Sequence, residues 1–391
     1  MSKPKIRFKG YEEDWEQRKV KEFAIESEVK GHSGKDAKKL TVKLHNKGVY
    51  VADEKIQGSD NTQYYIRRAG QFIYGKQNFF NGAIGIVPKK LDKYESTKDV
   101  PAFDVSSDVN VDWLYYYIAR PEIYKPQEAL CTGTGSKRFH VNNFYNLSLA
   151  IPKMDEQIKI KEYFVHLDNL ITLHQRKCEE TKKLKKYMLQ KMFPQNGKRV
   201  PEIRFVGFTE DWEQRKFGNV TELKSASRVH KEEWTTSGVP FYRSSDVMAA
   251  INGTENEKVY ISEALYEKLS SISGKLEAGD VLVTGGGSVG KPYIVPNNEP
   301  LYTKDADLLW IKNQGKFHPY FLYEFFFTPT FRSYLSSISH VGTIAHYTIT
   351  QLSETPICLP SVGEQQKIGD YFYNIDHLIT LHQRQYQKLF Q

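Results

Sequence analysis

A glycine-rich stretch gives the chain its most specific candidate for enzymatic chemistry. Residues 285–291 read GGGSVGK and follow the apolar run Val281–Val283, so they match the first seven positions of a phosphate-binding P-loop. The eighth position of that motif supplies a Ser or Thr hydroxyl to Mg²⁺ and opens a helix, but here it is Pro292. Because the strand-like run Tyr293–Val295 comes next, we interpret the glycines as a loop whose backbone can approach another surface closely. The sequence predicts no nucleotide hydrolysis at this loop.

The sequence gives no other pattern that predicts a catalytic or metal centre. It contains no His-Glu-x-x-His and no Cys-x-x-Cys, and no Gly-x-Gly-x-x-Gly that opens a βαβ unit. His174 and His382 are interpreted as packing or solvent-facing side chains, not as ligands. Cys131, Cys178 and Cys358 are too widely spaced for a disulfide framework or a zinc pattern. We therefore expect no catalytic residue, no metal and no cofactor in this chain.

The composition favours a cytoplasmic protein with a polyanionic partner. The 391 residues carry 55 Lys and Arg against 47 Asp and Glu, a formal net charge of +8. A basic balance of this kind suits nucleic acid or an acidic protein surface. Cysteines without a disulfide pattern fit a reducing compartment, and no run of 18 apolar residues predicts a membrane helix.

Basic and amide side chains gather in loops of both halves of the chain, where they are candidates for DNA contacts. Lys and Arg attract phosphates at any sequence, whereas Arg, Asn and Gln can also read base edges in the major groove. The candidates in the first half are Lys35, Lys38, Lys39, Arg67, Arg68, Lys76, Gln77, Asn78, Lys137 and Arg138. Those in the second half are Lys224, Arg228, Arg243, Ser244, Ser245, Gly286, Gly287, Ser288, Lys291, Lys304, His346 and Tyr347. A solvated surface role is open for each of them.

Two pairs of repeated blocks show how the chain positions these loops. Residues 4–20, PKIRFKGYEEDWEQRKV, match residues 201–217, PEIRFVGFTEDWEQRKF, at 12 of 17 positions. Residues 152–176 match residues 360–384 at 15 of 25 positions, and both blocks end in LITLHQR. Two such pairs in the same order indicate a tandem duplication. The sequences between the blocks are unrelated, so one framework carries two different inserts.

The second repeated block predicts a long helix. Ile160, Phe164, Leu167, Ile171, His174 and Cys178 alternate at spacings of four and three residues, which is the seam of a coiled coil. The helix is expected from about Asp155 to Met192, and its counterpart near the C-terminus from about Gly363. The two helices would pair antiparallel, although each could instead pack on its own domain. The basic stretch 176–199 is either a solvated face or a ridge toward DNA or an acidic partner.

Short β-branched and aromatic runs predict that both inserts are rich in strands. They include Tyr64–Ile66 and Gln71–Tyr74 in the first insert and Leu308–Ile311 in the second. The predicted fold class is α+β, with two β-rich domains in tandem duplication separated by two long repeated helices that form an antiparallel coiled coil. The expected boundaries are 1–152 for the first domain, 153–194 for the central helix, 195–359 for the second domain and 360–391 for the C-terminal helix.

These blocks together resemble the specificity subunits of type I restriction–modification systems. The resemblance rests on the block that opens each half, PEIRFVGFTEDWEQRK in the second half and its close copy in the first. It also rests on the EQ…KI…YF…LITLHQR block closing each insert, and on LKKYMLQKMFP at 184–194. It implies two target-recognition domains, each reading one half of a split, asymmetric site in double-stranded DNA. It further implies two methyltransferase subunits docked on the helices and restriction–translocase subunits beside them. S-adenosylmethionine, ATP and Mg²⁺ would then belong to those partners.

The resemblance leaves two points open. No counterpart of Leu184–Phe193 follows the second helix before Gln391, so the helix pair could be shorter than in the family. A duplicated scaffold that binds RNA or protein outside restriction–modification is the alternative function, and an enzyme built on the glycine-rich loop is a further one.

Overall fold

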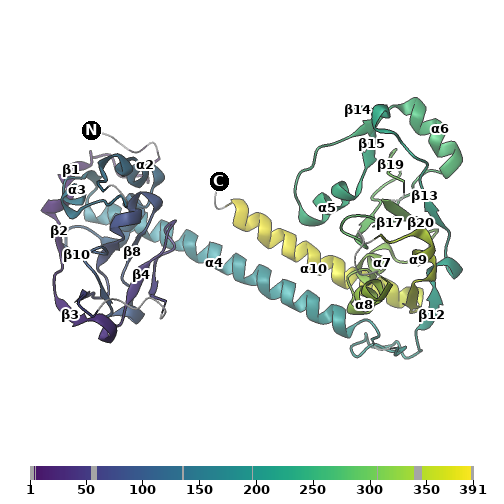
Figure 1. Ribbon diagram of the computed structural model, residues 1–391, viewed down its shortest axis with the longest axis horizontal. Coiled ribbons are helices and arrows are strands. Elements are labelled where there is room, and N and C mark those ends of the chain that lie inside the picture. The colour runs from purple at the N-terminus through teal and green to yellow at the C-terminus, as the bar shows by residue number, and fades with distance from the viewer. Residues whose placement is uncertain are drawn as a thin grey trace. The chain divides into compact units, whose positions relative to one another are not determined.

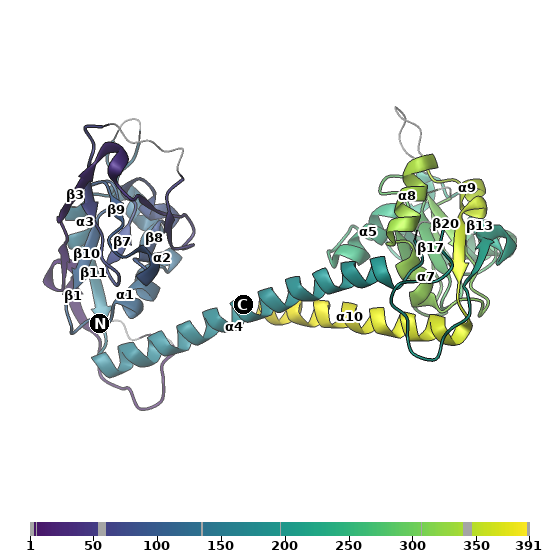
Figure 2. The same cartoon turned by 90° about the horizontal axis from the view of Figure 1, so that it is seen from below.

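The structure is a computed structural model that describes residue 4 and residues 6–53, 60–133, 136–195, 197–305, 307–338 and 346–388. The chain divides into two compact units, residues 1–170 and 171–391. Each unit contains β-sheets and helices (Figures 1 and 2), as the α+β prediction requires. The long helix α4, Met154–Lys191, begins in the first unit and ends in the second.

The first unit is built around a four-stranded sheet. Its strand order is β2-β10-β7-β8. The central strand β7 is buried throughout, and its neighbour β10 is buried at Ala102 and Phe103. Two smaller sheets, β3-β6-β9 and β4-β5, and the edge pair β1-β11 complete it. The strands are β1 Glu16–Lys19, β2 Ala24–Glu26, β3 Lys30–Ser33, β4 Leu40–Val42, β5 Val49–Val51, β6 Gln63–Ile66, β7 Phe72–Tyr74, β8 Ile84–Ile86, β9 Glu95–Ser96, β10 Ala102–Val105 and β11 Ser148–Ile151. The helices before α4 are α1 Val111–Ile118, α2 Pro121–Tyr124 and α3 Val141–Tyr145.

The second unit repeats this plan with a different insert. Its main sheet has the order β13-β20-β17-β18, and a second sheet has the order β14-β16-β15-β19. The strands are β12 Glu213–Lys216, β13 Leu223–Ser225, β14 Trp234–Thr235, β15 Val239–Tyr242, β16 Tyr260–Ile261, β17 Val281–Thr284, β18 Pro292–Ile294, β19 Tyr302–Thr303, β20 Leu308–Ile311 and β21 Pro356–Leu359. The helices are α5 Ser244–Asn252, α6 Glu263–Ser273, α7 Pro319–Phe325, α8 Pro329–Ile338, α9 Ile349–Glu354 and α10 Val362–Lys388.

The repeated blocks form the same framework in both units. Strand β1 pairs antiparallel with β11, with Glu16 opposite Ile151, and β12 pairs with β21 in the equivalent register, with Glu213 opposite Leu359. The four-stranded sheets correspond strand for strand, because β2, β10, β7 and β8 have their counterparts in β13, β20, β17 and β18. The duplication predicted from sequence therefore extends into the inserts, where the sequences themselves show almost no similarity.

A buried acid holds each framework together. Glu156, 1% exposed, accepts hydrogen bonds from Arg7 Nε at 2.7 Å and from Trp15 Nε1 at 3.2 Å. In the second unit Glu364 accepts the equivalent bonds from Arg204 and Trp212 at the same two distances. This Arg–Glu–Trp cluster ties the opening block of each half to the first turn of the helix that closes it. A carboxylate can be buried at acceptable cost only when it has a charged partner and its oxygen atoms accept hydrogen bonds, and both conditions are met here.

The glutamine that follows each of these acids positions the preceding helix. Gln157 Oε1 accepts the backbone N–H of Asn110, the N-cap of α1, at 2.7 Å. Gln365 Oε1 accepts the N–H of His318, the N-cap of α7, at 3.1 Å. The two N-caps are 208 residues apart, the same offset as the helix blocks, so α1 and α7 are equivalent elements.

In the second unit, α10 lies antiparallel beside the end of α4 (Figure 1). His174 Nδ1 lies 3.3 Å from His382 Nδ1, and Lys185 Nζ lies 2.6 Å from Asp376 Oδ2. The predicted antiparallel pairing is confirmed for this part of α4. The seam prediction is wrong for its first residues, because Ile160 packs on the first unit's core and the Phe164 ring stacks on Tyr116 at 5.2 Å. Each helix therefore begins on its own domain.

No helix in the described part of the chain is long and apolar enough to span a membrane.

Candidate nucleic-acid interface

The glycine-rich stretch forms the turn between β17 and β18 and is closed by its own backbone. The N–H of Gly290 donates to Thr284 O at 2.7 Å, and the N–H of Lys291 donates to Thr284 Oγ1 at 2.8 Å. A P-loop leads from a strand into a helix and points such amides at phosphate. Here a strand follows, as the sequence predicted, and burial lowers the pKa of Lys291, whose Nζ lies 5.2 Å from the Phe327 ring centroid.

Residues 286–290 of the same stretch also fit the pattern Gly-x-Ser-x-Gly. The nucleophile elbow with that pattern is a strained turn from a strand into a helix. Ser288 instead lies in the exposed part of a strand-to-strand turn, and its carbonyl oxygen accepts a hydrogen bond from Thr284 Oγ1 at 2.5 Å. The pattern therefore has no elbow geometry here.

Asp307 lies beside this turn and contacts several of the residues predicted to bind DNA. Its carbonyl oxygen accepts from Gly285 N at 2.7 Å and from Ser244 Oγ at 3.0 Å, and its carboxylate lies 2.5 Å from Lys304 Nζ. A Cβ atom on Gly286 would lie 3.2 Å from Asp307 Oδ1 and 3.7 Å from His346 Nδ1. Ser244, Gly286, Lys304 and His346 are thus brought together at one end of the main sheet, from four separate segments.

The first unit has an equivalent pair of loops. The connection from β7 to β8 carries Lys76, Gln77 and Asn78, and Lys76 O accepts the N–H of Phe139 at 2.8 Å. In the second unit Gly285 O accepts the N–H of Tyr347 at 2.7 Å, and Tyr347 lies 208 residues after Phe139. Both aromatic side chains are fully buried, so each anchors the end of a second loop beside the sheet turn. We name each turn with its neighbouring loop the paired loops. They are residues 75–83 with residues 132, 133 and 136–138 in the first unit, and residues 285–290 with residue 346 in the second.

Cations in the first unit's paired loops have acidic neighbours. Lys137 Nζ lies 2.7 Å from Glu128 Oε1, and Arg138 Nε lies 3.3 Å from Asp99 Oδ1. Lys76 is half-buried, and burial lowers the pKa of its ammonium. Gln77 is exposed, and Asn78 Oδ1 accepts from Asn81 Nδ2 at 3.1 Å. Exposed ion pairs of this kind contribute little to stability, so the cations can exchange an acid for a phosphate at low cost.

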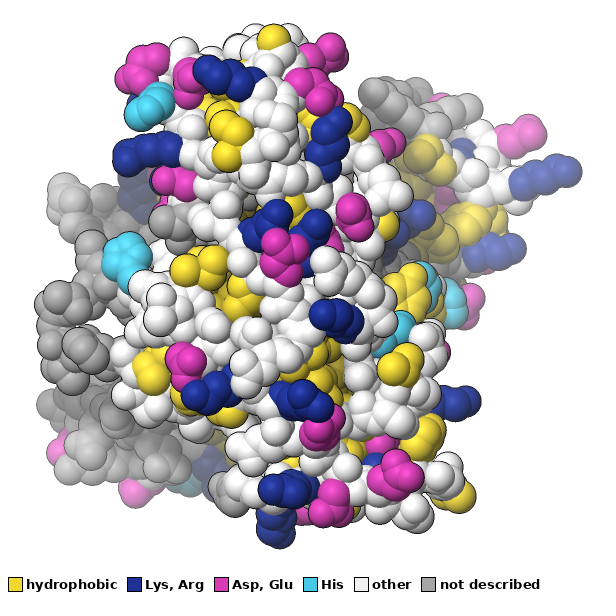
Figure 3. Space-filling view, turned by 90° about the vertical axis from the view of Figure 1, so that its right-hand side faces the viewer, with side chains coloured by type: hydrophobic (Ala, Val, Ile, Leu, Met, Phe, Trp, Pro, Cys, Tyr) yellow, Lys and Arg dark blue, Asp and Glu magenta, His cyan; other side chains and the backbone are white. Residues whose placement is uncertain are grey.

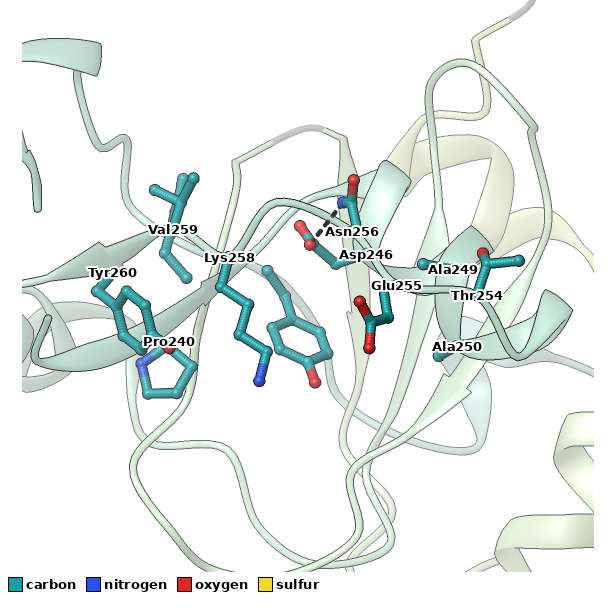
Figure 4. Close-up of a pocket in the computed structure, with 12 residues that line it drawn as sticks. Pro240, Asp246, Ala249, Ala250, Thr254, Glu255, Asn256, Lys258, Val259 and Tyr260 are labelled. Carbon is teal, nitrogen blue, oxygen red and sulfur yellow. Dashed lines mark hydrogen bonds between the residues drawn. The ribbon is translucent and has the colours of Figure 1, made fainter. Parts of the chain in front are cut away.

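A pocket of about 570 Å³ lies beside the start of α5 (Figure 4). Arg243 Nε donates to Asp246 Oδ2 at 2.9 Å, and Asn256 Nδ2 donates to Asp246 Oδ1 at 2.8 Å. Figure 4 shows the side chains of Glu255 and Lys258 in the same pocket as Asp246 and Asn256. Lys258 is exposed and was not among the predicted contacts, since nothing in its sequence surroundings distinguishes it from other surface lysines.

The chain is similar to known proteins both in sequence and in fold. The family model described as "Type I restriction modification DNA specificity domain" matches residues 209–391. The type I restriction enzyme MjaVIII specificity subunit of Methanocaldococcus jannaschii is 23% identical over 361 residues, which cover 89% of this chain and 78% of that protein. The framework of the matched half recurs in the first half at equivalent registers and contacts. Residues 209–391 therefore match the type I restriction–modification DNA specificity domain, and the whole chain is similar to a type I specificity subunit.

Solved structures of specificity subunits have the same fold. The type I S subunit from M. genitalium matches with a TM-score of 0.58 at 12% identity, covering 98% of this chain and 95% of that one. The HsdS subunit from Thermoanaerobacter tengcongensis matches with a TM-score of 0.50 at 15% identity, covering 96% and 93%. A third match is a chain from a structure that describes complex assembly and conformational transition of the type I R-M system. Its TM-score is 0.53 at 16% identity, and the match covers 96% of this chain and 94% of that one.

Two predicted DNA contacts are corrected by burial. Arg67 is 1% exposed, and its guanidinium donates to Ser96 Oγ at 2.7 Å and to Ser27 O at 2.7 Å. Burial lowers the pKa of Arg67 to about 10. Tyr347 is also 1% exposed, and its hydroxyl lies against Thr355 Oγ1. Both are packing residues. Gly286 is buried as well, whereas Gly287 and Ser288 are exposed.

Other predicted contacts lie away from the paired loops. Arg68 is exposed beside the start of β7, at the opposite end of that strand from Lys76. Lys38 and Lys39 precede β4, and Lys39 Nζ lies 5.4 Å from the Tyr64 ring centroid. The side chain of Lys35 lies outside the described part. In the second unit Lys224 donates to Ser273 O at 3.2 Å, while Arg228 and Ser245 are exposed. On the face that Figure 3 shows, Lys and Arg side chains are interspersed with Asp and Glu.

We expect Arg67→Ala to destabilise the first unit without a selective effect on DNA sequence. The substitution leaves Ser27 O and Ser96 Oγ buried without their donor and opens a cavity, which costs about 2–4 kcal/mol in free energy of unfolding. Arg68→Ala is the matched control, since Arg68 is exposed, and should change this free energy by less than about 0.5 kcal/mol. Urea unfolding of both variants measures the difference, and equal midpoints would contradict the burial argument.

Proposed function

We propose that this chain acts as a specificity subunit that recognises a two-part DNA site, with the paired loops of each unit reading one half of it. The observation that carries the proposal is one framework, held by the same Arg–Glu–Trp cluster, presenting two unrelated sets of loops. A duplicated reader with two different contact surfaces suits an asymmetric target. The net charge of +8 favours a polyanion, and the exposed Gln77, Ser288 and His346 offer donors and acceptors at the loops.

In this proposal the chemistry belongs to partner subunits. Two methyltransferase subunits would dock on the chain and supply S-adenosylmethionine, and restriction–translocase subunits would supply the site for ATP and Mg²⁺. The specificity subunit would contribute binding energy and position only. Support comes from the match to the specificity domain and from the sequence, which lacks a motif for any of these cofactors.

Exchanging one insert should change one half of the recognised sequence. Residues 218–358 are replaced by the equivalent insert of a related specificity subunit, and the complex with the methyltransferase subunits is used to methylate DNA. Mapping the methylated adenines should show one new half-site and one unchanged half-site, because each wrong base pair costs roughly 1–3 kcal/mol at its own reader.

The reciprocal exchange of residues 21–150 is the matched control and should change only the other half-site. A change in both halves after either exchange would refute independent reading. Preference of the unaltered chain for single-stranded RNA over duplex DNA would instead favour the alternative of an RNA-binding scaffold.

A further inference from the structure

The β4–β5 hairpin of the first unit carries positive charge and no acid. Residues 37–52 contain four lysines and neither Asp nor Glu. Leu40 and Val49 are buried in one cluster of the first unit's core and hold the inner face of the hairpin there. Because side chains alternate along a strand, Lys43 and Tyr50 lie on the outer face, and both are exposed. The hairpin therefore presents a cationic face to solvent.

Two ammonium groups lie at the exposed ring of Tyr50. Lys43 Nζ lies 4.1 Å from the ring centroid, and Lys90 Nζ, from the turn after β8, lies 5.9 Å from it. A cation at the face of an exposed ring gains about 0.5–1 kcal/mol, which positions the ammonium groups but leaves their charges uncompensated. Lys47 in the hairpin turn and Lys89 beside Lys90 are also exposed. We name Lys43, Lys47, Lys89 and Lys90 with Tyr50 the hairpin patch.

None of these four lysines forms an ion pair with an acid that the structure describes. The acid nearest to Lys90 in the sequence, Asp92, accepts the backbone N–H of Ala69 at 2.9 Å. Lys137 of the paired loops, by contrast, lies 2.7 Å from Glu128. Like charges gathered without acids repel one another, and a bound polyanion relieves that repulsion. The hairpin patch therefore fits an anionic partner.

The hairpin is fixed directly against the paired loops. The N–H of His45 donates to Asn81 O at 2.9 Å, and the N–H of Asn46 donates to Gly82 O at 2.8 Å. Asn46 Nδ2 also donates to Ala119 O at 2.9 Å, which holds the turn from a second side. Residues 81 and 82 belong to the loop proposed to read bases, so the hairpin patch begins where that loop ends.

We propose that the hairpin patch binds the phosphate backbone of duplex DNA beside the first unit's half-site, whatever the base sequence there. This inference rests on the proposed function, because the paired loops bring DNA to this side. Lysine suits the role, since its ammonium is a point charge that attracts phosphate at any sequence. Beside its main sheet the second unit has the sheet β14-β16-β15-β19, and its described residues contain no counterpart of β4-β5. The extra contact is therefore expected at one half-site only.

The test measures how binding depends on salt, with the chain in complex with methyltransferase subunits on a duplex that carries its methylated site. Lys43→Ala combined with Lys90→Ala should reduce the slope of log binding constant against log salt concentration by about two, since each phosphate contact contributes about one. The affinity should fall by the same factor for a scrambled duplex, and the methylated sequence should not change. Lys43→Arg combined with Lys90→Arg should keep the slope, because both charges remain.

Ethylation interference locates the contact on the DNA. Some phosphates should weaken binding when ethylated with the unaltered chain but not with the double alanine variant. They should lie beside the half-site that insert exchange assigns to the first unit, and none beside the other. Lys9→Ala combined with Lys21→Ala is the matched control, because both lysines are exposed on the first unit's framework. It should leave the slope and the interference pattern unchanged.

An unchanged slope or interference pattern in the double alanine variant would overturn this inference and leave the proposed function intact. A loss of affinity confined to the duplex with the methylated site would also overturn it, because the patch would then read bases. Poorer recovery of the methyltransferase subunits with an unchanged DNA slope would assign the patch to an acidic protein surface. If the unaltered complex does not prefer its site to the scrambled duplex, the proposed function fails, and this inference fails with it.

Discussion

Replacing Glu364 by Ala should unfold the second unit under conditions in which the unaltered protein is folded. Glu364 is completely buried and accepts two bonds from Arg204, at 2.7 and 2.8 Å, and one from Trp212. Without the carboxylate, a largely buried guanidinium and an indole N–H keep no partner. Breaking one side of a buried ion pair costs about 3–5 kcal/mol, which is a large part of the stability of a domain.

Thermal and urea unfolding measure this effect. Glu354→Ala removes an acid of the same unit that is paired with Lys216 at the surface, and is expected to cost less than about 1 kcal/mol. Glu364→Ala combined with Arg204→Ala should cost less than the sum of the single substitutions, because the two residues act as one unit. Additive losses, or a Glu364→Ala variant as stable as Glu354→Ala, would mean that the Arg–Glu–Trp cluster does not hold the framework.

Inserting four residues between Leu170 and Ile171 should lengthen the unread gap of the DNA site by one or two base pairs. The insertion adds about one turn, or roughly 6 Å, to α4 while nearly preserving the face it presents. The structure argues against placing the insertion after the helix, between Met192 and Pro201. Met192 and Phe193 are buried, and Lys191 O accepts the N–H of Ile203 at 2.9 Å, so an insertion there would disrupt the second unit itself.

Methylation mapping of the insertion variant decides whether α4 sets the gap. Both half-sites should keep their sequences, and methylation at the original spacing should fall at least about a hundredfold, since the two readers would no longer fit it together. A two-residue insertion turns the helix by about 200° and should reduce methylation at every spacing. An unchanged gap with full activity would show that the helix does not measure it.

The framework could be predicted from the sequence because the blocks that form it occur twice in the chain. The blocks around Trp15 and Trp212 and around Glu156 and Glu364 recur with high identity, and each places its residues at the same register. The sequence could not show why these residues recur. The contacts between Arg7 and Glu156 join positions 149 residues apart, and only the folded unit brings them together.

Individual DNA contacts were less predictable, because residue type does not determine exposure in a β-rich insert. Arg67 and Arg68 are neighbours, yet Arg67 is buried and Arg68 is exposed. Tyr347 resembled a contact through its polar hydroxyl, but its offset of 208 from the buried Phe139 marks it as an anchor. That offset was available in the sequence and could have identified it. Asp307 and its neighbours come from separate segments, which no local pattern connects.

The buried end of α4 has a consequence for the order of events during synthesis. Met192 and Phe193 leave the ribosome long before Phe321 and Phe372, the residues that cover them in the second unit. At 5–20 residues per second, the 179 residues between Phe193 and Phe372 take about 9–36 s to make. During that interval the nascent chain displays an uncovered apolar helix end, which chaperones can bind. A chain that stops before α10 would display it permanently, and should be lost to aggregation or proteolysis.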